Sequence, residues 1–206
     1  MKKAITKILF FILLGWPNLW AGEAWQPIQE IVIQADLASD HKEQKALAKK
    51  ALALAEACLQ KNPKEAACYY YRAQALGLSN QSFLGYMKRI RSMREDWAKT
   101  MAINPNFDYG GPYRMFAEIY MELPRHFGPS DLRQDLKKAL DYLNKAIKIA
   151  DNYPTNQLDM AKVLFELNKQ AEARHALEKV DGILPRWKSH PYYASWLNTL
   201  KSLKGK

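Results

Sequence analysis

Residues 110–114 read Gly-Gly-Pro-Tyr-Arg and open a segment in which apolar side chains recur every three or four positions. The same spacing returns in Leu-Asn-Lys-Ala-Ile-Lys-Ile-Ala-Asp at 143–151 and in the segment that Gln-Ala-Glu-Ala-Arg opens at 170–174. Spacing by three and four predicts helices with one apolar side, whereas a strand would alternate by two. Helices joined by short connections pack as antiparallel neighbours. This stretch therefore predicts an array of helical pairs.

Proline-containing turns divide the rest of the chain into further helical segments. Asn-Pro at 62–63 and at 104–105 ends two of them. Pro112 takes a first helical position, where its missing N–H costs nothing. Asp131 stands three residues before Gln134, a spacing typical of a helix N-cap. The expected helices are 25–40, which has the weakest pattern, then 46–61, 65–78, 82–103, 112–123, 132–150, 155–168, 170–184 and a last helix from 191.

The recurring Asn-Pro turns indicate a repeat of irregular length. They stand at 62–63 and 104–105, and a looser echo stands at 152–154, so they are spaced more widely than the 34-residue tetratricopeptide repeat. A last helix with few partners suits the end of a solenoid. We therefore expect an all-α, tetratricopeptide-like array of helical pairs, an irregular α-solenoid with a C-terminal capping helix. It forms one domain over residues 25–206.

The first 21 residues have the pattern of a secretory signal. Three lysines within the first seven residues precede a short apolar run at 8–14, and small residues follow, with cleavage expected near Ala21 or Ala24. The run is shorter than the roughly 20 residues that cross a bilayer. A retained membrane anchor is the alternative. No cysteine lies near either cleavage point, which argues against a lipid anchor. We expect a periplasmic protein without stable membrane insertion.

The charge balance is basic but carries no nucleic-acid signature. The chain has 31 Lys and Arg against 21 Asp and Glu, a formal net charge of +10. These basic residues are dispersed, and no DNA- or RNA-binding motif accompanies them. The sequence predicts a solvated basic surface and no nucleic-acid partner.

Two cysteines, Cys58 and Cys68, flank the first Asn-Pro turn almost symmetrically. This places one on each arm of a helical hairpin. In an oxidising compartment they could form a disulfide, for which the Cα atoms must come within about 7 Å. The alternative is two buried thiols that act as small apolar residues. The sequence leaves both readings open.

Reactive and metal-binding patterns are missing from the sequence. The four histidines, at 41, 126, 175 and 190, have no metal-ligand spacing within one helix. Gly110-Gly111 is a turn before a helix and not a phosphate-binding loop. No serine has the context of a nucleophile elbow. We expect a protein that is not an enzyme and needs no cofactor or metal.

Arginine and tyrosine are the candidate binding residues. Arg94 lies on an apolar stripe, so it reaches solvent at the stripe's edge, pairs with an internal acid or meets a bound anion. Arg114 has tyrosines around it, and Arg with Tyr suits recognition of carboxylates or partner surfaces. Inter-helix packing is the alternative for the tyrosines. The helices that carry them are first members of successive pairs, which line one face of a solenoid. The candidates are Tyr70, Tyr71, Arg94, Tyr113, Arg114, Tyr120 and Asn156.

Several segments resemble the T-component family of tripartite ATP-independent periplasmic (TRAP) transporters. They are residues 109–114, 117–124, 140–146, 153–161, which contains Asn156, and 172–177. The resemblance implies an all-helical periplasmic accessory protein that contacts the solute-binding component, with a small organic ligand as a further candidate. The main alternative is a scaffold for cell-envelope assembly without a small-molecule ligand. A third is an enzyme on a helical scaffold. The sequence leaves a homo-oligomer open.

Overall fold

The computed structural model describes residues 24–79, 85–126 and 129–205, and these residues are helical without a strand. The predicted leader at residues 1–21 and its cleavage point at Ala21 lie outside the described residues. The helices are α1 (Gln26–Leu37), α2 (His41–Lys61), α3 (Ala66–Ser79), α4 (Tyr86–Ile103), α5 (Phe107–Glu122), α6 (Leu136–Ile149), α7 (Pro154–Glu166), α8 (Gln170–Ile183) and α9 (Tyr193–Lys204), with two short 3-10 turns, η1 (Ser130–Leu132) and η2 (Leu184–Trp187).

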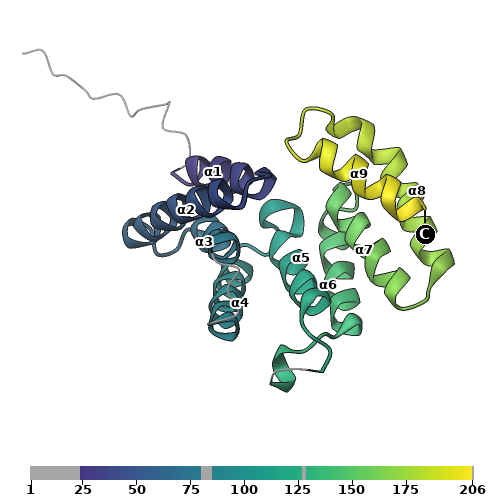
Figure 1. Ribbon diagram of the computed structural model, residues 1–206, viewed down its shortest axis with the longest axis horizontal. Coiled ribbons are helices and arrows are strands. Elements are labelled where there is room, and N and C mark those ends of the chain that lie inside the picture. The colour runs from purple at the N-terminus through teal and green to yellow at the C-terminus, as the bar shows by residue number, and fades with distance from the viewer. Residues whose placement is uncertain (1–23, 80–84, 127–128, 206) are drawn as a thin grey trace, which may run out of the picture.

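The helices follow one another as antiparallel pairs (Figure 1). The pairs are α1 with α2, α3 with α4, α5 with α6, and α7 with α8. The first members also contact one another in order, α1 with α3, α3 with α5 and α5 with α7. Helix α9 packs on α7 and α8 at the end of the array. The predicted all-α, tetratricopeptide-like array of helical pairs is confirmed.

Most helix ends follow the expected signals. The C-cap of helix α2 is Asn62 and that of α4 is Asn104, and each of these residues precedes a proline. The prediction of a cap at Asp131 was wrong. Residues 130–132 form the turn η1 and Arg133 is extended, so the helix begins later. Its N-cap is Asp135, whose carboxylate accepts a hydrogen bond from the Lys138 N–H at 3.0 Å.

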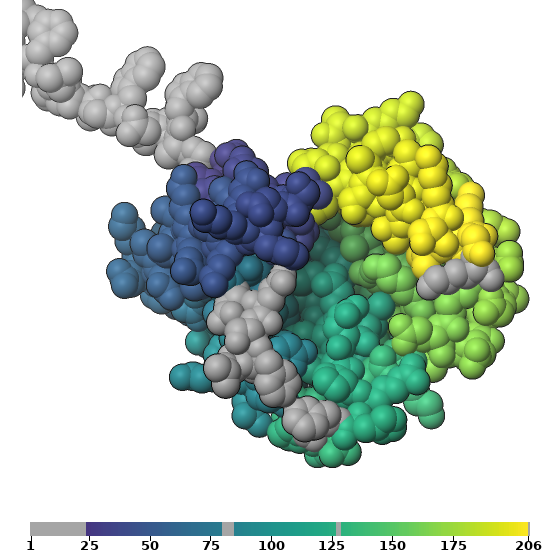
Figure 2. Space-filling view, in the orientation of Figure 1, coloured from purple at the N-terminus to yellow at the C-terminus, as the bar shows by residue number. Residues whose placement is uncertain are grey.

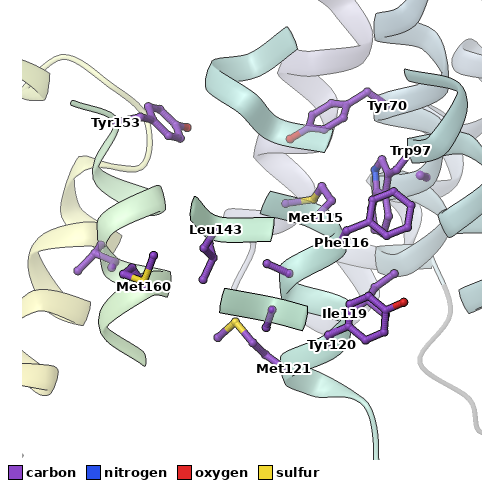
Figure 3. Packing of buried hydrophobic residues seen from close by; sticks show 14 of the residues in the cluster. Tyr70, Trp97, Met115, Phe116, Ile119, Tyr120, Met121, Leu143, Tyr153 and Met160 are labelled. Carbon is purple, nitrogen blue, oxygen red and sulfur yellow. The ribbon is translucent and has the colours of Figure 1, made fainter. Parts of the chain in front are cut away.

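One continuous core connects the pairs. Fully buried alanines line the contacts between α2 and α3, where they let the helix backbones approach closely. Larger side chains fill the centre, where Trp97 from α4 lies beside Phe116 from α5 and Met121 lies one turn further along (Figure 3). On α2, by contrast, Leu54 is 38% exposed. The core therefore runs mainly along the first members of the pairs.

Helices α2 and α3 are also joined covalently. The structure places Cys58 and Cys68 in a disulfide with their Cα atoms 6.1 Å apart. Both cysteines are buried, one on each arm of the hairpin that turns at Asn62. This cross-link fixes the second helical pair against the first.

The array curves until its two ends approach each other. Figure 2 shows the purple-blue N-terminal helices and the yellow C-terminal helix meeting at the rim of a hollow, with teal segments behind it. Asp36 of α1 and Tyr192, which directly precedes α9, line the same cavity, and burial and then the Asp36 carboxylate raise the pKa of Tyr192. Leu37 of α1 and Pro191 line one shallow depression between the same ends. The concave side of the array is thereby partly enclosed.

Candidate functional site

The enclosed concave side contains a cavity of about 440 Å³. Its wall comes from the first members α1, α3, α5 and α7, from two residues of α4, and from the segment between His190 and Trp196. This volume lies within the range of roughly 300–1,000 Å³ that small-molecule sites occupy. The cavity is thus the candidate functional site.

A left-handed turn at the start of α5 shapes the cavity floor. Asp108, Tyr109 and Gly110 have φ values of 48°, 57° and 78°. Two of these residues are not glycine, and left-handed conformations cost them free energy. The helix proper starts only after this turn, with Pro112 in its first turn, as the sequence indicated. The turn brings Asp108 back towards the helix that it precedes.

Asp108 and Arg114, which both line the cavity, form an ion pair in which the guanidinium is buried and the carboxylate is 19% exposed. Arg114 Nη2 lies 2.6 Å from Asp108 Oδ2, and Arg114 is 3% exposed. The Tyr70 hydroxyl donates to the same carboxylate oxygen at 2.6 Å and accepts from Arg114 Nη2 at 3.2 Å. Burial, and then the charge of Asp108, raise the pKa of Tyr70 well above its ordinary value. Tyr70 therefore stays a neutral phenol that can donate to the carboxylate.

Asn156 ties this ion pair to the neighbouring helices. Its side-chain oxygen accepts from Arg114 Nη1 at 3.1 Å. Its amide nitrogen donates to the carbonyl of Tyr109 at 3.1 Å and to the carbonyls of Ala146 and Ala150 at 3.3 and 2.9 Å. The end of α6, the start of α7 and the left-handed turn are therefore held by one side chain.

These contacts change the role expected for Arg114. The sequence suggested an arginine available to a carboxylate of a ligand or partner. In the structure both terminal nitrogens of Arg114 are bonded within the protein, and its charge is matched by Asp108. The guanidinium also lies over the ring of Tyr153, 4.9 Å from its centroid. Arg114 thus builds the wall of the cavity and is not a free anion-binding group.

Glu118, one turn further along α5, is the second carboxyl group that α5 contributes to the cavity lining, after Asp108. Burial, and next the nearby carboxylate of Asp159, raise its pKa to about 8, against the opposing effects of Arg114 and Lys162. Asp159 itself is buried, and its Oδ1 pairs with Lys162 at 2.7 Å. Its Oδ2 has no hydrogen-bond partner among the described residues. Two carboxylates thus share a poorly solvated position.

Aromatic rings from the start of α7 and from the C-terminal segment at 190–196 close one side of the cavity. Tyr153 stacks on Tyr109 with centroids 4.6 Å apart, and His190 stacks on Trp196 at 4.5 Å. Burial raises the pKa of Tyr153 to about 12 and lowers that of His190. Figure 3 shows the hydroxyls of Tyr70 and Tyr153 directed towards each other, with Met115 below Tyr70, and Arg114, which contacts both tyrosines, is not drawn there.

The candidate residues from the sequence fall into two groups. Four of them surround the cavity or its floor: Tyr70, Tyr71, Arg114 and Asn156. The others form an aromatic group between α4, α5 and α6: Arg94, Tyr113 and Tyr120, around Tyr142.

The Arg94 side chain is 24% exposed, and its Nε is buried without a hydrogen-bond partner among the described residues. It lies 3.5 Å from the carboxylate of exposed Asp131 and donates to the Asp131 carbonyl at 3.1 Å. Its guanidinium stands over the ring of Tyr120, 5.9 Å from the centroid. Two lysines add charge there, with Lys138 at 5.2 Å from the ring centroid of Tyr120 and Lys145 at 5.2 Å from that of Tyr142. The described structure does not bring Arg94 into the cavity.

Sequence reasoning missed Asp108, Glu118, Tyr153 and Trp97. Asp108 precedes the two glycines, and that position was a usable signal for a turn residue. Glu118 has no distinguishing pattern in the sequence, and Glu122, one helical turn later on α5, is exposed. In the described ranges, no group of three or more His, Cys, Asp or Glu side chains is arranged to hold a metal ion. Among the described helices, none is both long and apolar enough to cross a membrane.

Comparison with known proteins supports the fold. No protein-family model matches this chain, and no curated protein matches it. Among solved structures, the chain is similar to the crystal structure of a thermophilic TPR protein from Thermus thermophilus, with a TM-score of 0.59 and 20% sequence identity. The match covers 88% of this chain and 83% of that chain. At this identity the similarity establishes a tetratricopeptide-like fold and leaves the function to the site.

Proposed function

We propose that this protein is a non-enzymatic binding protein whose concave cavity holds a segment of a protein partner. The observation that carries the proposal is the position of the cavity, on the side that the first members of all four helical pairs share. Stacked helical repeats create extended concave surfaces of the kind that bind partner chains. The paired groups Asp108, Arg114 and Tyr70 form a rigid wall and present no free reactive group.

Site-specific photo-crosslinking tests this proposal. Ser195 is exposed on α9 and lines the cavity, whereas Lys201 is exposed on the same helix outside it. Benzoylphenylalanine is placed at one position or the other, in the protein produced by its native cells. We expect one discrete crosslinked protein from position 195 and none of it from position 201. The same products from both positions would contradict a partner in the cavity.

We further propose that the protein acts in the periplasm as an accessory component of TRAP-type solute uptake. The resemblance of residues 109–177 to T-component segments and the signal pattern at 1–21 support this role. The partner in the crosslink would then be a periplasmic solute-binding protein. Its identification by mass spectrometry as an envelope-assembly protein would favour the alternative, a scaffold without a small-molecule ligand. Recovery of the protein in the cytoplasmic fraction would contradict both.

A further inference from the structure

The cavity is acidic although the chain as a whole is basic. Asp36 and Glu118 both line it, and the one arginine in its wall, Arg114, is already matched by Asp108. Arg114 and Lys162 act on Glu118, but they form their ion pairs with Asp108 and Asp159. Burial lowers the pKa of His190, so this imidazole brings no positive charge at neutral pH. The cavity therefore holds more acidic than basic side chains, inside a protein of net charge +10.

The same cavity offers aromatic surface on three sides. Tyr71 comes from α3, Trp97 from α4 and Trp196 from α9. Aromatic rings attract cations through their negative faces, most strongly where water is excluded. Carboxylates together with aromatic walls match a positive charge on an apolar stem, such as the side chain of lysine or arginine.

A buried hydrogen-bond donor adds an independent signal. Trp97 is 3% exposed and forms part of the cavity wall, and its indole N–H has no hydrogen-bond partner among the described residues. Buried donors in folded proteins nearly always have an acceptor. This nitrogen is closed to solvent in the structure, so a carbonyl of a bound peptide would reach it after a rotation of the indole ring, whereas a simple alkylamine has no acceptor to offer.

We infer that the cavity binds a lysine or arginine residue of a peptide segment, with the cationic group at Glu118 and Asp36 and a peptide carbonyl at the Trp97 indole. This inference rests on the proposed function, because both place a partner segment in the cavity. The inference specifies in addition that the recognised residue of the partner is basic. A basic residue with its flanking backbone is of the size that a cavity of about 440 Å³ accepts.

Binding of a cation at Glu118 should depend on pH. Its carboxyl has a raised pKa of about 8, and the charged groups that act on it are Asp159 and Lys162 from α7, Arg114 from α5 and Asp36 from α1. Below this pKa the empty site holds a proton that a cation must displace. The affinity should therefore rise between about pH 6.5 and 8.5, while a lysine ammonium, with a pKa near 10.4, stays charged.

The test uses the indole N–H signal of Trp97 in ¹⁵N NMR spectra, assigned with Trp97→Phe. Two capped tripeptides, acetyl-Ala-Lys-Ala-amide and its norleucine analogue, are compared with n-butylammonium on the full-length mature protein. We expect the lysine peptide to shift the signal and to bind about tenfold more tightly than the norleucine peptide. Glu118→Gln should lose this preference and the pH dependence. The matched control Glu122→Gln, on the exposed side of the same helix, should retain both.

Three results would overturn the inference. Equal binding of the lysine and norleucine peptides would remove the charge requirement and leave a peptide-binding cavity. Binding of n-butylammonium as tight as that of the lysine peptide would replace the peptide by a free amine. No shift with any probe, in a protein that still crosslinks a partner from position 195, would reject the basic residue while the proposed function stands.

Discussion

The two glycines at 110 and 111 serve different purposes in the same turn. Gly110 has a φ of 78°, and a Cβ there would lie 3.0 Å from the Cα of Ala146 on α6. Gly111 has no such backbone requirement, but a Cβ would lie 2.5 Å from the Tyr70 hydroxyl. One glycine therefore permits the backbone path, and the other makes room for the buried hydrogen bonds.

Both glycines should be intolerant of alanine. Gly110→Ala places a side chain in a left-handed conformation at a cost of roughly 1–3 kcal/mol. Gly111→Ala should also destabilise, because it displaces the Tyr70 hydroxyl from Asp108. Gly182→Ala is the control: its Cβ meets nothing within 4 Å, and alanine should stabilise the helix α8 by about 0.5–1 kcal/mol. Urea denaturation measures all three, and wild-type stability of the first two variants would contradict the assignment.

The buried ion pair should be costly to break from one side. Arg114→Met leaves Asp108 with an uncompensated charge in the cavity wall, so we expect a loss of about 3–5 kcal/mol. Adding Asp108→Asn to Arg114→Met should restore part of that loss. Arg94→Met removes a half-exposed pair and should change stability by about 0–1 kcal/mol. Equal effects of the two arginine variants in thermal unfolding would show that Arg114 is not part of a buried pair.

Part of this site could be predicted from single residues and part could not. Arg114, Tyr70 and Asn156 were recognised as candidates from composition and resemblance. Their joint arrangement depends on the left-handed turn, which returns Asp108 to a residue six positions later. Helical spacing gives no sign of such a contact, because it pairs positions three and four apart. The position of Asp108 indicates a turn, but its pairing with Arg114 could not be predicted from the sequence.

At the scale of elements, turn residues were the reliable signals. Asn62 and Asn104 end their helices as predicted, and Pro154 begins α7. The prediction failed between Pro124 and Asp135, where the apolar spacing continues from Leu132 but the backbone is extended at Arg133. Leu132 is fully buried from a 3-10 turn, so its burial does not require a helix. Apolar spacing therefore predicts which residues are buried. It predicts a helix only where capping residues also stand at the ends of the segment.

The hairpin of α2 and α3 should depend on its cross-link. Removing the disulfide by Cys58→Ala with Cys68→Ala should cost roughly 2–3 kcal/mol, the loop entropy expected for a short closed loop. A reducing agent should lower the melting temperature of the wild type and leave the double variant unchanged. Thiol titration of unfolded, unreduced protein from an oxidising compartment should find no free thiol. Two free thiols would exclude the bridge.

At the scale of the whole molecule, the curvature creates the site. Hydrophobic spacing predicts the helices and their pairing, but small rotations between pairs accumulate into the curvature, and no local pattern records them. The approach of α1 to the C-terminal segment, visible in Figure 2, is the result of that accumulation. The cavity is lined by residues of both α1 and the C-terminal segment. Sequence analysis therefore found some of its residues without predicting the cavity.

Contact between the two ends should make distant helices depend on each other. In an open solenoid each repeat contacts only its neighbours, so a change beside α9 would not reach α1. Here Asp36 of α1 and Tyr192 line the same cavity, and the Asp36 carboxylate acts on the Tyr192 hydroxyl. Tyr192→Phe removes this polar contact between the two ends, which should be worth about 0.5–1.5 kcal/mol. We expect faster amide hydrogen exchange in α1 of this variant, while Tyr193→Phe, the neighbouring control, leaves α1 unchanged. Unaltered exchange in α1 of Tyr192→Phe would mean that the ends are independent in solution, and the cavity would then be an open groove.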